Sequence, residues 1–135
     1  MIRSSGYVIG SEDSADTLTA AYAGNASTFP VGGKYQLQLY VEYTPAANNR
    51  TLSIQMEFSP DQSDFYKVVM TSLDSSGTET ITVREPQKFL GATADTTYKV
   101  RVSEPVADSH CRISVKEDGS SDFGSVTLRY RAVGE

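Results

Sequence analysis

The sequence has no tryptophan, one histidine and one cysteine. These low counts limit the covalent cross-links and the functional sites that the chain can form. Because Cys111 stands alone, no disulfide can form within the chain, and the fold does not depend on an oxidising compartment. No apolar run approaches the roughly 18 residues that span a membrane. The first ten residues lack the apolar core of a signal peptide. We therefore expect a soluble protein that is made in a cytoplasm.

Positive charge is also in short supply. The chain carries 12 basic and 17 acidic residues, a net charge of -5, which disfavours a general nucleic-acid binder but leaves room for a local basic face. Its 135 residues fit one domain with a single core.

The chain shows a regular alternation of apolar and polar residues. In residues 51–58 the apolar Leu52, Ile54, Met56 and Phe58 alternate with polar residues, as in a strand with one buried face. A polar turn at 59–64 leads into a second arm in which Tyr66 resumes the apolar face. The same alternation predicts further strands at residues 34–43, 68–73, 79–84 (running on toward 89), 97–103, 110–117 and 125–132. About seven or eight short strands, regular turns and no convincing helix predict an all-β fold, an antiparallel β-sandwich of jelly-roll type.

Residues 1–30 differ from the rest, being rich in Ser, Ala, Thr and Gly with scattered large apolar residues. We expect an extended N-terminal arm over 1–30 that packs on something, followed by a β-sandwich domain over 31–135. Within the arm, residues 16–23 fit a short helix or a weak edge strand. A frayed terminus is the alternative.

No catalytic, cofactor or metal site stands out, and we expect the protein not to be an enzyme. His110 precedes Cys111, but neighbours on a strand face opposite sides, so the two side chains should diverge. Asp61 with Asp64, and Asp118 with Asp122, have the loop spacing of calcium ligands. Aspartates are also ordinary turn residues, and the EF-hand spacing is absent.

Cations occupy the outward positions of the last three expected strands. If these strands share one sheet, its wet face would dock an acidic partner. The alternative is ordinary cross-strand pairing with Glu42, Glu57 or Glu117. The six positions are Lys99, Arg101, Arg112, Lys116, Arg129 and Arg131.

Tyr40 is a further outward residue of interest. Together with Gln36 and Gln38 it would form a platform for a sugar or a protein, although an exposed tyrosine on a sheet is also ordinary.

Two segments resemble small β-sandwich proteins of tailed-phage virions. LSIQMEFSPDQSDFYKV, at 52–68, is similar to the x-V-Q-x-S-x-D-G-x-x-F/W-Y hairpin of phage decoration and other head-associated proteins, with Gln62 in place of the glycine. HCRISVKEDGSSDFGSVTLRY, at 110–130, is similar to their R-I-S-x-x-E-x-G-x-x-x-G-x-V ending. The resemblance covers about three-quarters of the chain, from residue 34 onward. Similar hairpins occur in carbohydrate-binding and discoidin-like sandwiches.

The resemblance implies a capsid decoration or cement protein, made in the host cytoplasm and placed on the capsid surface of the virion. Its partner would be the major capsid protein or another virion protein, and it would be a homo-oligomer, with a trimer favoured. It would bind neither a membrane nor nucleic acid directly.

The N-terminal arm would order on binding, and the exposed edge strand at 79–89 would add oligomer contacts. The alternative is a carbohydrate-binding module or an adhesion domain of a phage tail or neck. The arm residues expected to contact a partner are Tyr7, Ile9, Leu18, Tyr22 and Phe29.

Overall fold

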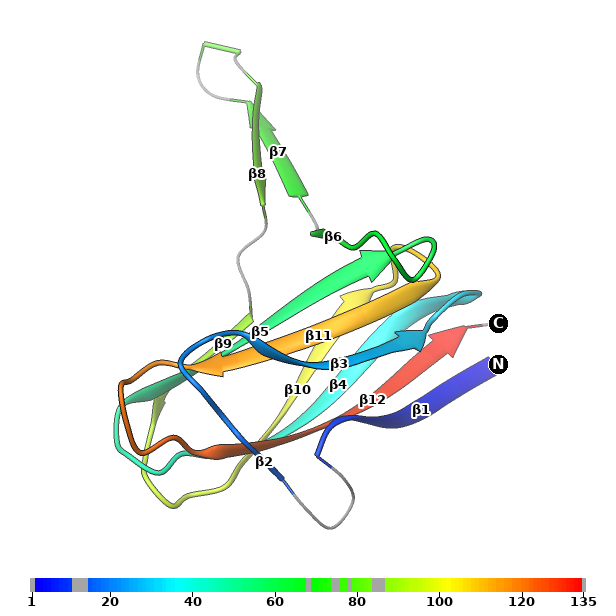
Figure 1. Cartoon of the computed structure of the whole chain (residues 1–135). Helices are drawn as coiled ribbons and strands as arrows, with labels where there is room; N and C mark the ends of the chain where they lie inside the picture. Colours follow the sequence, from blue (N-terminus) through cyan, green and yellow to red (C-terminus); the bar gives the residue numbers. More distant parts are fainter. Residues whose placement is uncertain are drawn as a thin grey trace.

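The computed structural model describes residues 2–10, 15–67, 69–73, 76–77, 79–83 and 87–134. Two antiparallel sheets pack face to face as a β-sandwich, which confirms the predicted fold class (Figure 1). Eight strands of six residues or more build the two sheets in the described part of the chain, and no helix is found there. In those residues no helix is long and apolar enough to cross a membrane.

The first sheet, called here the β4 sheet, has the strand order β1-β12-β4-β10, and β2 also pairs with β12. Its strands are β1 (Ile2–Ile9), β2 (Asp16–Thr17), β4 (Lys34–Thr44), β10 (Tyr98–Pro105) and β12 (Ser125–Gly134). The second sheet, the β5 sheet, has the order β3-β11-β5-β6, and β9 also pairs with β5. Its strands are β3 (Ala23–Pro30), β5 (Arg50–Ser59), β6 (Tyr66–Lys67), β9 (Gln87–Ala92) and β11 (His110–Glu117).

The core lies between the two sheets and consists of the apolar members of each alternating strand. Burial of one such side chain contributes about 1.5–3 kcal/mol, so this interior supplies the main drive for folding. Across the four central strands the fully or nearly buried apolar residues are Leu37, Leu39, Val41, Tyr43, Leu52, Ile54, Met56, Phe58, Cys111, Ile113, Val115, Val126, Leu128 and Ala132.

The N-terminal segment is extended, as expected, but it belongs to both sheets. β1 pairs with β12 over its length, and β3 pairs with β11. A register shift between Tyr7 and Ile9 allows the neighbours Val8 and Ile9 both to face the core. Phe29 of β3 stacks on Tyr130 of β12 with ring centroids 4.1 Å apart, linking the two sheets. The boundary expected at residue 30 therefore lies inside the sandwich and does not separate an arm from a domain.

The central hairpin forms, but its second arm is short. β5 pairs with β6 at only two positions, Glu57 with Lys67 and Phe58 with Tyr66. Tyr66 was expected to face inward, yet it is 58% exposed because it lies on a two-residue edge strand. In the turn, Gln62 has a φ of 69°, a left-handed conformation that glycine adopts most easily. This is the position at which the resembled hairpin carries glycine.

The stretch expected as one edge strand over 79–89 is two strands in different sheets. β8 (Glu79–Val83) pairs with β7 (Val69–Leu73), whereas β9 pairs with β5 at the edge of the β5 sheet. Residues 84–86, which include Pro86, lie outside the described residues. In Figure 1 the β7–β8 hairpin projects away from the body of the sandwich.

Candidate functional site

The six outward cations do not form one stripe. Lys99 and Arg101 lie on β10, and Arg129 and Arg131 on β12, so these four share the β4 sheet. Arg112 and Lys116 lie on β11 in the β5 sheet. The chain changes sheet between β10 and β11 and again between β11 and β12, so the condition that the three strands share a sheet is not met.

On the β4 sheet, the strand register aligns aromatic and cationic residues in one row. Tyr7 of β1 pairs with Arg129 of β12, Arg129 pairs with Tyr40 of β4, and Tyr40 pairs with Arg101 of β10. Directly paired residues project on the same face of a sheet. The outer face of the β4 sheet therefore presents the order Tyr7, Arg129, Tyr40, Arg101 across its four main strands.

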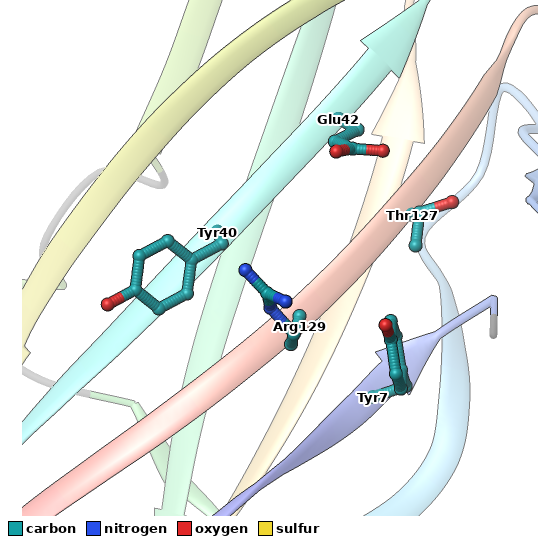
Figure 2. A pocket seen from close by; sticks show the side chains of 5 residues that line it. All are labelled: Tyr7, Tyr40, Glu42, Thr127 and Arg129. Carbon is teal, nitrogen blue, oxygen red and sulfur yellow. The ribbon is translucent and has the colours of Figure 1, made fainter. Parts of the chain in front are cut away.

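Figure 2 shows a shallow hollow on this face with Arg129 between the two tyrosines. Its volume is about 250 Å³, and its lining is completed by Glu42 and Thr127. The guanidinium carbon of Arg129 lies 5.2 Å from the ring centroid of Tyr40, a cation–π contact that holds the guanidinium in place. The Tyr40 hydroxyl donates a hydrogen bond of 2.9 Å to the Gln38 side-chain oxygen, which orients the ring.

The electrostatics of this face are cationic although the whole chain is acidic. Lys99 lies 3.9 Å from Glu42, and both side chains are largely exposed, so the pair contributes little. Within the described residues, no ion pair engages Arg101, Arg129 or Arg131. Arg101 and Arg129 are exposed, so their charges lie at the surface of this sheet.

The cations of the opposite face are engaged internally. Arg112 donates to Glu57 at 3.1 Å across the β5–β11 register and lies 4.0 Å from the ring centroid of Phe65. Lys116 lies 4.6 Å from the ring centroid of Tyr22. For Arg112, the structure therefore bears out the cross-strand pairing alternative.

Three of the N-terminal residues expected to touch a partner are buried in the sandwich. Ile9, Leu18 and Phe29 are 3%, 3% and 6% exposed and pack in the core. A partner cannot reach them while the sheets are intact. Tyr7, at 38% exposure, is accessible on the outer face of the β4 sheet.

The side chains of His110 and Cys111 do not come together in one reactive site. The His110 Nδ1 atom lies 2.9 Å from the Ser109 hydroxyl oxygen, whereas Cys111 is fully buried in the core. Burial, helped by the charge of Glu57, raises the pKa of the Cys111 thiol to about 12. The thiol is therefore protonated and behaves as a small apolar side chain.

The aspartates of the two turns accept hydrogen bonds from the backbone of the chain around them. Asp61 Oδ1 accepts hydrogen bonds from the backbone N–H groups of Asp64 and Ser63, which lower the pKa of Asp61 to about 2. Asp118 Oδ1 accepts from the Thr51 N–H at 2.6 Å. Within the described residues, no group of three or more His, Cys, Asp and Glu side chains is arranged to hold a metal.

Glu117, one of the carboxylates expected to pair with surface cations, is completely buried. One carboxylate oxygen accepts a hydrogen bond from the Tyr43 hydroxyl, and the other accepts from the Gly124 N–H at 2.9 Å. Burial and the bond to Glu117 raise the pKa of Tyr43 above its ordinary value. The signal was present in the sequence, because Glu117 continues the buried parity of Cys111, Ile113 and Val115.

The described residues thus define a β-sandwich with a cationic, aromatic outer face and a projecting hairpin. The chain matches no family model, no curated protein and no solved structure.

Proposed function

We propose that the protein is a structural component of a phage virion, a decoration or cement protein that binds the outside of a capsid lattice. The observation that carries the proposal is the β7–β8 hairpin. Its strands pair with each other, join neither main sheet, and stand clear of the sandwich (Figure 1). A projecting segment of this kind can contact a neighbouring molecule.

The physical argument is that a lone hairpin is poorly stable by itself. A two-stranded hairpin is at best marginally stable in water and gains stability from a surface that covers it. The residues that pair include Val69 with Val83 and Thr71 with Ile81, types that favour strands. We assign the hairpin to contact with the major capsid protein or another virion protein.

Two further features support the proposal. The resemblance to phage head-associated proteins rests on residues 52–68 and 110–130, and Gln62 holds the left-handed backbone expected of the glycine position in that hairpin. A protein that stabilises a capsid lattice also needs binding surfaces but no active site. The oligomer contacts of the proposed trimer are assigned to the outer strands β9 and β10, each of which pairs with a strand on one side only among the described residues.

The first test is density-gradient sedimentation of the native source material, with this protein located by mass spectrometry. We expect it to run with particles of megadalton size. Recovery near the top of the gradient, as a monomer or small oligomer, would contradict a virion role.

The second test replaces residues 69–83 with a short Gly-Ser turn. Because the hairpin pairs with neither main sheet, the variant should keep the cooperative unfolding of the sandwich while losing co-sedimentation with particles. A length-matched control keeps the hairpin but substitutes Thr or Ser at 69, 73, 81 and 83. If the shortened variant still binds particles fully, the hairpin is not the attachment element.

A further inference from the structure

We propose that the hollow around Arg129 on the outer face of the β4 sheet binds an acidic saccharide, one in which a sugar ring carries a carboxylate. The carboxylate would bind Arg129, and the ring would lie against Tyr7 and Tyr40. This inference goes beyond a role in a virion and does not rest on it.

Arg129 is suited to a carboxylate ligand. Its side chain is exposed, no ion pair among the described residues engages it, and its guanidinium is held near the Tyr40 ring. A planar guanidinium binds a carboxylate through two parallel hydrogen bonds, and stacking on an aromatic ring pre-organises that geometry.

The two tyrosines are suited to the sugar ring. Tyr7 and Tyr40 stand on β1 and β4, either side of β12, so their backbones are separated by two strand spacings of about 4.8 Å each. A tyrosine ring offers an apolar face with a polar tip, which suits a ligand that has an apolar ring face and polar edges. Glu42 completes the wall with a carboxylate that accepts hydrogen bonds from hydroxyl groups (Figure 2).

A neighbouring hollow extends the site. It has a volume of about 260 Å³ and shares Tyr40 and Arg129 with the first, while Ser5, Tyr130 and Arg131 complete its lining. Arg131 adds a second cation that no ion pair among the described residues engages. Two hollows that share Tyr40 and Arg129, the second also lined by Arg131, match an oligosaccharide that carries repeated carboxylates.

The position of the site on a sheet face favours a saccharide over a polypeptide. An extended peptide binds a sheet through the unpaired backbone groups of an edge strand. Here β12 and β4 are interior strands whose backbone groups are engaged by neighbours on both sides, so the face offers side chains alone. A polyphosphate chain is disfavoured because it has no apolar ring face to lie against Tyr7 and Tyr40, which line the hollow.

The test is isothermal titration calorimetry of the full chain with an oligogalacturonate and with a neutral oligosaccharide of the same length. We expect saturable binding of the acidic ligand that weakens with added salt, and binding of the neutral ligand weaker by about tenfold or more. Arg129→Gln should weaken the acidic ligand by about tenfold or more. Tyr7→Ser should weaken it as well.

Lys116→Gln is the matched control. It also removes one cation that lies over a tyrosine ring, but on the β5 sheet, and should leave binding unchanged. Absence of binding at millimolar acidic ligand, or wild-type affinity in Arg129→Gln, would overturn the proposal. Tighter binding of an oligoglutamate peptide with the same Arg129 dependence would overturn the choice of a saccharide. None of these outcomes bears on particle attachment, which sedimentation tests separately.

Discussion

At the scale of single residues, the carboxylate of Glu117 is a buried acidic group in the core of the sandwich. It is fully buried, and its two oxygens accept hydrogen bonds from the Tyr43 hydroxyl and the Gly124 N–H, while no cation pairs with it among the described residues. A side-chain Cβ at position 124 would collide with the backbone of Thr44, so the close approach of this turn to β4 requires glycine. The cluster ties the turn after β11 to the β4 sheet and acts as a bridge between the sheets.

We predict that Tyr43→Phe destabilises the protein by about 1–3 kcal/mol, because a buried carboxylate oxygen loses its hydrogen-bond donor. Urea unfolding followed by circular dichroism measures the change in unfolding free energy. Tyr35→Phe removes a hydroxyl from a ring that is 54% exposed and serves as the control, with no change expected. Equal stability of the two variants would mean that the Tyr43–Glu117 bond contributes nothing net.

At the scale of elements, β1 and β3 differ sharply from the β7–β8 hairpin. Val8, Ile9, Leu18 and Phe29 together bury four large apolar side chains, each worth about 1.5–3 kcal/mol. Their sum is comparable with the whole stability of a typical domain, about 5–15 kcal/mol. The hairpin, by contrast, contributes no strand to either main sheet.

We therefore predict that deletion of residues 2–30 abolishes cooperative unfolding and leaves a chain prone to aggregate, since β12 and β11 would become exposed edges. Thermal melting and size-exclusion chromatography measure the loss. Replacement of residues 69–83 is the comparison and should shift the melting temperature little. A truncated chain that melts as sharply as the full one would show that the N-terminal strands are dispensable, as expected of a separate arm.

At the scale of the whole molecule, the chain closes on itself from its two ends. β1 pairs with β12, so the first and last strands of the sequence lie side by side, as Figure 1 shows. The later strands β10, β11 and β12 alternate between the sheets, so most pairings join residues far apart in sequence. The chain must therefore lose the entropy of closing long loops before the contacts that offset this loss can form.

We predict that the protein refolds from urea in milliseconds to seconds, the range of sandwiches dominated by non-local pairing. Stopped-flow fluorescence of the tyrosines measures the rate, and Tyr130, stacked on Phe29, reports closure of β3 against β12. Refolding in microseconds would indicate that local hairpins control the rate.

Sequence alone determined the central strands and their buried faces, but not that β1 and β3 join the two sheets or that β8 and β9 are separate strands. Alternation of apolar and polar residues is a local property of the chain, so Leu52 to Phe58 and Cys111 to Val115 could be assigned to the core from their spacing. The outward placement of Tyr40, Arg101 and Arg129 could be inferred in the same way.

Tertiary structure alone decided which strands are neighbours. Strand order depends on pairings between distant residues, which leave no periodic mark in the sequence. For this reason the six cations divide between two sheets, and Tyr7 joins Arg129 and Tyr40 in one hollow. For the same reason Ile9, Leu18 and Phe29 are core residues although no strong alternation surrounds them. The physical cause is that burial depends on what covers a residue, and that partner is chosen by the fold as a whole.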